Sequence, residues 1–174
     1  MNAIQQIVAF LRGETAVEPA QSGPLSVVKQ ADGTYRWVLI SSNSFEDRDK
    51  EVVSQAALEA DVARADREQD YGPLLWWHLN GKVKDGEQLP RVVLGDCDFN
   101  AMHGRMLIES GTFVSTDVAL AVEKEAPNLE VSLGFDFPEQ ALAPDGTIHA
   151  IRRTERSLLP RGRASNPRTA VPIV

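Results

Sequence analysis

The sequence from residue 129 to residue 137 alternates between apolar side chains and polar or small ones. This period of two is typical of a β-strand with one face in a core. The apolar face consists of Leu129, Val131, Leu133, Phe135 and Phe137. On the other face, Ser132 lies beside Gly134, and the missing side chain leaves room for the backbone of another molecule. We interpret Ser132 as a candidate nucleophile; the alternative, which this strand alone favours, is an ordinary solvent-facing serine.

The remaining pattern predicts about seven strands and three helices in a chain of 174 residues. The expected strands are 25–30, 34–42, 74–79, 91–99, 105–110, 129–137 and 147–159. The expected helices are 2–13, 54–69 and 116–126, with Ser54 and Ser115 as N-caps of the second and third. Because strands predominate and most are joined as hairpins, we expect a mainly β fold, an antiparallel barrel or sandwich with attached helices.

The first 24 residues are expected to differ from the rest. Residues 2–13 have the apolar spacing of a short amphipathic helix, and residues 14–24 read as a linker. This divides the chain into an N-terminal helix and linker at 1–24 and one domain at 25–174. The helix either packs on that domain or docks on a partner.

Charge and apolar content exclude several classes of protein. The net charge is −7, but residues 150–174 hold six arginines and one acid, which leaves −12 on the preceding 149 residues. An acidic body argues against specific nucleic-acid binding. No apolar run has the length of a membrane span, and the N-terminus does not read as a signal peptide.

Two further sites are disfavoured by their surroundings. Cys97 is the single cysteine, so it cannot form an internal disulfide, which suits a reducing compartment. Nearby carboxylates disfavour its thiolate. Glu46, Asp47 and Asp49 lie in one polar loop but lack the spacing of a calcium loop. We therefore expect neither a metal nor another cofactor.

A nucleophilic serine needs a base, and the base needs an orienting acceptor. His78 is the best base, because it ends an expected strand beside a polar loop. Glu155 and His149 are both candidates for the third position, since both lie on the expected strand 147–159. The stretch 161–163, Arg161, Gly162 and Arg163, is the candidate oxyanion site, because glycine lets backbone N–H groups turn outward and the arginines add positive potential.

Five short segments together resemble the prohead (capsid maturation) proteases of tailed bacteriophages. They are SFEDRDKEVV at 44–53, LLWWH at 74–78, EVSLGF at 130–135, TERSLLP at 154–160 and ASNP at 164–167. The resemblance covers about residues 35–170 and rests on the joint order and spacing of these segments. The double tryptophan before His78 and the Arg-Gly-Arg connection depart from the family pattern.

The resemblance implies a fold like the herpesvirus assemblin proteases, a closed antiparallel β-barrel surrounded by helices. It also implies a serine protease with the triad His78, Ser132 and Glu155. Its substrates would be major capsid protein and scaffold segments, and itself, inside the assembling prohead in the host cytoplasm. A homo-oligomer, with a dimer as one option, would be expected. The alternatives are a non-catalytic scaffold or capsid-binding barrel and, more weakly, a small-ligand binder.

Overall fold

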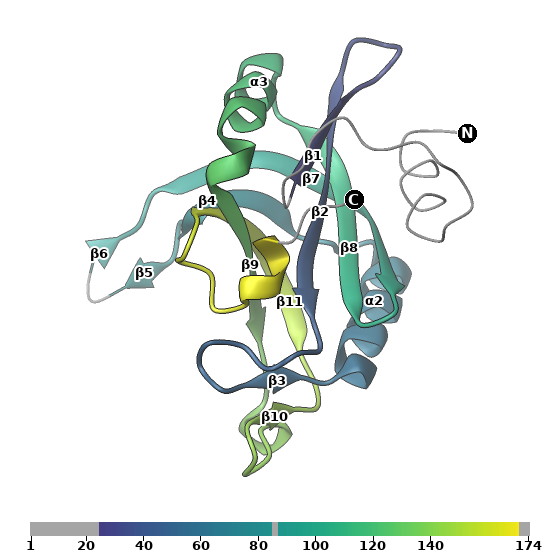
Figure 1. Ribbon diagram of the computed structural model, residues 1–174, viewed down its shortest axis with the longest axis vertical. Helices are drawn as coiled ribbons and strands as arrows, with labels where there is room; N and C mark the ends of the chain where they lie inside the picture. Colours follow the sequence, from purple (N-terminus) through teal and green to yellow (C-terminus); the bar gives the residue numbers. More distant parts are fainter. Residues whose placement is uncertain (1–24, 85–86, 171–174) are drawn as a thin grey trace.

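The structure is a computed structural model that describes residues 25–84 and 87–170. The expected helix at 2–13, the linker and the last four residues lie outside this range. The main sheet has seven strands in the order β1-β2-β8-β7-β4-β11-β9. Figure 1 shows that this sheet is curled. These strands are β1 (Leu25–Lys29), β2 (Tyr35–Asn43), β4 (Pro73–Asn80), β7 (Arg91–His103), β8 (Met106–Phe113), β9 (Leu129–Asp136) and β11 (Arg152–Pro160).

The remaining elements are short or lie on the sheet. Two-residue strands form two small pairs, β3 (Val52–Val53) with β10 (Thr147–Ile148) and β5 (Val83–Lys84) with β6 (Glu87–Gln88). The helices are α2 (Gln55–Glu68) and α3 (Thr116–Glu125), with 3-10 turns η1 (Ala126–Asn128), η2 (Glu139–Ala141) and η3 (Pro167–Ala170). Neither α2 nor α3 has the length and apolarity needed to cross a membrane.

The sheet is a half-barrel, which corrects the expected closed antiparallel barrel. In the described residues β1 pairs only with β2, and β9 pairs only with β11, so the sheet has two open edges. The pairing of β4 with β11 is parallel, and therefore the sheet is not wholly antiparallel. The sequence signals for hairpins predict neighbouring strands correctly, but they carry no information on whether the first and last strands meet.

Local signals account for the hairpins and helix starts. Gly33 has a φ of 87° in the β1–β2 turn, a left-handed conformation that glycine adopts without steric cost. The side chains of Ser54 and Ser115 accept hydrogen bonds from backbone N–H groups in the first turns of α2 and α3. The predicted N-caps are therefore confirmed.

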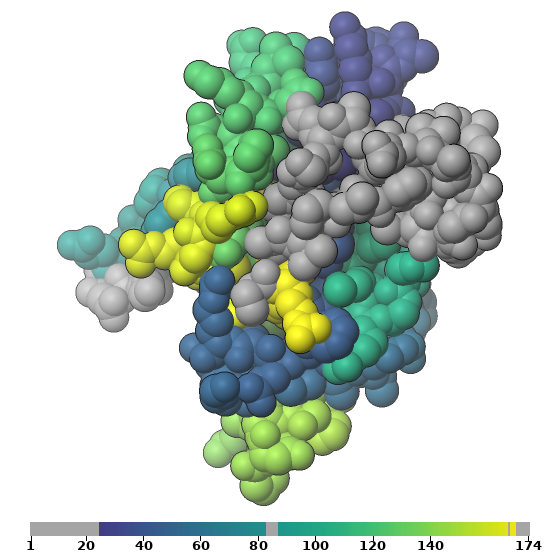
Figure 2. Space-filling view, viewed as in Figure 1, coloured from purple at the N-terminus to yellow at the C-terminus, as the bar shows by residue number. Residues whose placement is uncertain are grey.

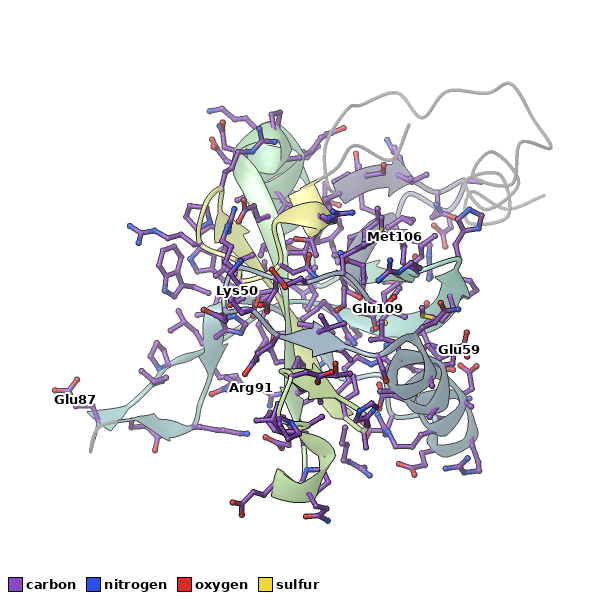
Figure 3. The ribbon with its side chains drawn as sticks, turned by 60° about the horizontal axis from the view of Figure 1, so that its bottom comes forward. Lys50, Glu59, Glu87, Arg91, Met106 and Glu109 are labelled. Atoms are coloured by element: carbon purple, nitrogen blue, oxygen red, sulfur yellow. The ribbon has the colours of Figure 1, made fainter. Side chains whose placement is uncertain are left out.

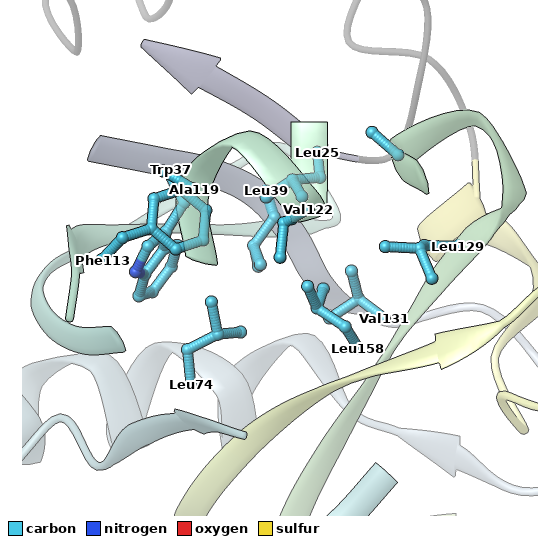
Figure 4. Packing of buried hydrophobic residues seen from close by; sticks show 11 residues of the cluster. Leu25, Trp37, Leu39, Leu74, Phe113, Ala119, Val122, Leu129, Val131 and Leu158 are labelled. Atoms are coloured by element: carbon cyan, nitrogen blue, oxygen red, sulfur yellow. The ribbon is translucent and has the colours of Figure 1, made fainter. Parts of the chain in front are cut away.

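The apolar core lies between the curled sheet and α3 (Figure 4). Its buried members come from both halves of the chain: Leu25, Trp37, Leu39, Leu74, Phe113, Ala119, Val122, Ala126, Leu129, Val131 and Leu158. Leu129 and Val131 come from β9, as its alternation predicts. Leu133 and Phe135 are only half-buried and Phe137 is 37% exposed, so the expected continuous apolar face ends midway along the strand.

A buried charged cluster joins β8 to β11. Glu109 is fully buried, and its carboxylate accepts hydrogen bonds from Arg153 and Arg156 (Figure 3 labels Glu109). Arg153 also pairs with Asp61 of α2 at 3.1 Å and donates to Asn100 of β7. Desolvation alone would raise the pKa of Glu109, but the two arginines outweigh it and hold that pKa below its ordinary value. The cluster fixes the position of β11, the strand that carries Glu155.

Candidate active site

A bulge in β11 places the two buried arginines of this strand and Glu155 on opposite faces. Arg153 pairs with Phe135, but Glu155 pairs with Gly134, so β11 carries one extra residue at this point. Without the bulge, alternation would place residue 153 on the same face as residue 155. With it, Arg153 shares a face with Arg156, and Glu155 is free to point to the opposite face.

β4 positions His78 through an irregular backbone. Trp77 and His78 have φ values of 53° and 56°, and each left-handed non-glycine residue costs about 1–2 kcal/mol. The parallel register pairs Trp76 with Leu158, so a regular strand would bring His78 level with Pro160. Instead, the left-handed pair turns the chain back, and the backbone N–H of His78 donates to Ser157 Oγ at 3.0 Å.

The His78 ring and the Glu155 carboxylate form the centre of the site. His78 Nδ1 lies 2.6 Å from Glu155 Oε1, and Ser157 Oγ donates to Glu155 Oε2 at 2.7 Å. An ionised carboxylate only accepts hydrogen bonds, so Nδ1 carries a proton, and in the neutral imidazole Nε2 keeps a lone pair. The His78 side chain is 39% exposed while that of Glu155 is 5% exposed. The arrangement is therefore a solvent-reachable imidazole oriented by a buried acid, as general-base catalysis requires.

Gly134 makes room for this acid. A Cβ at position 134 would lie 2.0 Å from Glu155 Oε1, far inside van der Waals contact. The space beside Ser132 is therefore filled by the side chain of Glu155, and the interpretation that it admits the backbone of another molecule is wrong.

Ser132 lies on the same face as this pair. In the β9–β11 register it is directly opposite Ser157, and Gly134 is opposite Glu155, so all four residues share one face. Ser132 is half-buried, whereas Ser157 is fully buried. No hydrogen bond joins Ser132 to His78 among the described residues. Of the two serines, only Ser132 is accessible to another molecule.

A small cavity of about 120 Å³ borders Ser132. It lies between the end of β2, the loop that follows β2, and β9. Its lining residues are Ser41, Ser42, Asn43, Phe45, Asp47, Asp49, Glu51, Val53, Ser132, Leu133, Phe135, Ile148, Ser165 and Asn166. His78 is not among them, so this cavity lies to one side of the His78–Glu155 pair.

Within the segment 161–163, the Gly162 amide is directed at a carboxylate, and that carboxylate is Glu130. Glu130 is buried on β9, two residues before Ser132, and accepts a hydrogen bond from the Ala164 N–H at 2.9 Å. Desolvation would raise its pKa, but the Gly162 and Ala164 amides and Arg48 together lower it. Figure 2 shows this segment, in yellow, on the surface beside the blue loop that contains Arg48.

The other amides of this segment are also engaged. Arg161 N–H donates to Asn128 O at 2.8 Å, and Arg163 N–H donates to Pro160 O at 3.2 Å. The side chains of Arg161 and Arg163 are exposed. In this arrangement the segment supports β9 from outside, and its use as an oxyanion site, which stays a prediction, would require some of these amides to be released.

No family model matches this chain. Comparison with curated proteins and with solved structures also gives no match.

The other candidate residues lie apart from the site. His149 is exposed between β10 and β11, because the expected strand 147–159 is interrupted there; its N–H donates to Ala141 O. Cys97 is half-buried, and desolvation, reinforced by Glu109, raises the pKa of its thiol to about 12. The described residues contain no group of three or more side chains arranged to hold a metal ion.

Two residues of the site were missed by sequence reasoning. Ser157 follows Glu155 by two positions in an expected strand, so alternation alone placed both on one face. Arg48 lies in the charged loop after β2, and its guanidinium is 3.4 Å from the Glu130 carboxylate. No local signal in the sequence indicates that this loop reaches the face of β9 that carries Ser132.

Proposed function

We propose that this chain is a serine endopeptidase that cuts scaffold or capsid-protein segments, and itself, during assembly of a tailed-phage head. Ser132 attacks the scissile carbonyl, His78 Nε2 accepts the serine proton, and Glu155 holds Nδ1–H and stabilises the imidazolium. His78 then returns the proton to the leaving amine.

The observation that carries this proposal is the 2.6 Å contact between His78 Nδ1 and Glu155 Oε1. The two residues are 77 positions apart and come from different strands. The contact sets the tautomer that a general base for a serine needs, on the face of the sheet that carries Ser132. The phage-head substrates rest on the sequence resemblance alone.

The test is cleavage of the cognate capsid and scaffold proteins, read by mass spectrometry of the fragments. Ser132→Ala is expected to remain folded and to release no fragments. Ser26→Ala is a matched control, because Ser26 is a strand serine on the opposite edge of the sheet. Cleavage by Ser132→Ala at the wild-type rate would overturn the assignment.

The second candidate is a non-catalytic scaffold or capsid-binding protein. The observation in its favour is that Ser132 and His78 are not hydrogen-bonded among the residues described. It predicts that capsid protein binds to the chain without being cut, and that head assembly is unaffected by Ser132→Ala.

A further inference from the structure

We propose that Ser157 is a positioning residue that fixes both the tautomer and the location of His78. This inference rests on the proposed peptidase function but is tested separately from it. Ser157 is fully buried on β11, between the His78 backbone and the Glu155 carboxylate. It therefore cannot contact a substrate and acts only through its two neighbours.

The hydroxyl of Ser157 accepts one hydrogen bond and donates another, and the chemistry of its partners fixes which is which. The backbone N–H of His78 can only donate, so Ser157 Oγ accepts there through a lone pair. The single hydroxyl proton is then directed to Glu155 Oε2, 2.7 Å away. This leaves Oε1 to receive the proton of His78 Nδ1. The Ser157 hydroxyl thus contacts the His78 backbone directly and the His78 ring through the Glu155 carboxylate.

The left-handed backbone explains why such a link is needed. Trp77 and His78 are successive non-glycine residues with positive φ, a conformation that persists only when surrounding contacts hold it. The register of β4 with β7 also shifts between Leu75 and Asn80, so regular pairing does not hold this turn. Two described contacts tie the turn to β11: the ring of His78 contacts Glu155, and its backbone N–H donates to Ser157.

Loss of the hydroxyl would affect both partners of Ser157. In Ser157→Ala, the His78 N–H and one oxygen of the buried Glu155 lose their bonding partner, and unsatisfied buried groups of this kind are costly. The turn is then free to relax toward regular strand geometry, which moves the ring away from Ser132. We expect kcat to fall about 10- to 100-fold with KM changed less than about 3-fold, since the substrate does not touch Ser157.

The matched control is Ser110→Ala. Ser110 is also a fully buried strand serine, and its Oγ donates to Trp37 O at 2.6 Å. It lies on β8, away from the His78–Glu155 pair, so its loss should lower thermal stability without changing kcat. Ser157→Thr keeps the hydroxyl and is expected to recover at least part of the kcat lost in Ser157→Ala.

The deciding measurement is the NMR signal of the His78 Nδ1 proton, assigned by its absence in His78→Ala. Wild type and Ser110→Ala should show a downfield, slowly exchanging proton, and folded Ser157→Ala should lose it or shift it upfield. An unchanged signal and unchanged kcat in folded Ser157→Ala would overturn the positioning role. Because this signal requires no turnover, it tests Ser157 even if the chain cleaves nothing. Absence of cleavage would reject the peptidase function alone.

If Ser157→Ala does not fold, the same two readouts are compared between Ser157→Thr and Ser157→Cys, whose thiol is a weaker donor. A wild-type proton signal and a wild-type kcat in Ser157→Cys would overturn the positioning role.

Discussion

The substitution Gly134→Ala tests the site without touching any of its polar groups. The added Cβ would lie 2.0 Å from Glu155 Oε1, 2.6 Å from its Cδ and 2.9 Å from its Cγ. These atoms belong to the end of a side chain, so the carboxylate can move while the backbone of β9 and β11 stays paired. To regain ordinary contact at 3.4 Å, Oε1 must move by about 1.4 Å.

The size of the effect follows from this displacement. His78 Nδ1 and Glu155 Oε1 are 2.6 Å apart, and a shift of that size lengthens the contact beyond hydrogen-bonding distance. A hydrogen bond to a charged group contributes about 1.5–3 kcal/mol, which corresponds to about 10- to 150-fold in rate. We therefore expect kcat to fall about 100-fold, with an unfolding free energy lowered by no more than about 3 kcal/mol.

The assay is the rate of substrate cleavage at saturation, with thermal unfolding measured in parallel. Gly104→Ala is the control, because Gly104 lies in the β7–β8 turn with open space around its Cα and a φ of 57°. It should lose about 1 kcal/mol or more of stability from its left-handed backbone and keep full activity. A folded Gly134→Ala protein with wild-type kcat would refute the role assigned to the Glu155 carboxylate.

Four further predictions concern Glu155, Glu109 and Cys97. Glu155→Gln should lower kcat far more than His149→Ala, because only Glu155 contacts His78; the reverse ranking in cleavage assays would indicate a His–His arrangement. Glu109→Gln should lower the unfolding free energy measured in urea by about 3–5 kcal/mol, since it removes the buried negative charge that Arg153 and Arg156 share and leaves only Asp61 to pair with Arg153. Because the folded pKa of Glu109 lies below its ordinary value of 4.5, its stabilisation is complete above that pH and is lost as pH falls below it, so the wild-type protein should lose stability below about pH 4.5 more steeply than Glu109→Gln does. Cys97, with a thiol pKa of about 12, should resist iodoacetamide at pH 8 in the folded protein and react once the protein is unfolded; rapid alkylation of the native state would contradict the raised pKa.

Local sequence patterns predicted most of the elements that carry the site. Alternation predicted β9, the serine caps predicted the starts of α2 and α3, and the apolar run before Asn80 predicted β4. The choice of His78 and Glu155 as partners agrees with their contact in the structure. Each of these signals depends on residues close together in the chain, so it can be read without knowing the tertiary structure.

The features that were not predicted depend on contacts between distant segments. The left-handed turn at Trp77 and His78 contains no glycine to mark it, and it is held from β11. Neither the bulge before Glu155 nor the break between β10 and β11, which divides the expected strand 147–159, has a visible signal in the sequence. The prediction of a closed barrel was wrong for the same reason, because the distance between β1 and β9 follows from the curl of the whole sheet.

The proposed mechanism requires that Ser132 is a nucleophile activated by His78. The most direct test is treatment with a fluorophosphonate, followed by mass spectrometry of the modified peptide. We expect one adduct on Ser132 in the wild-type protein, formed at least about 100-fold more slowly in His78→Ala. No adduct in the folded wild-type protein, or equal labelling of Ser132→Ala, would contradict the account.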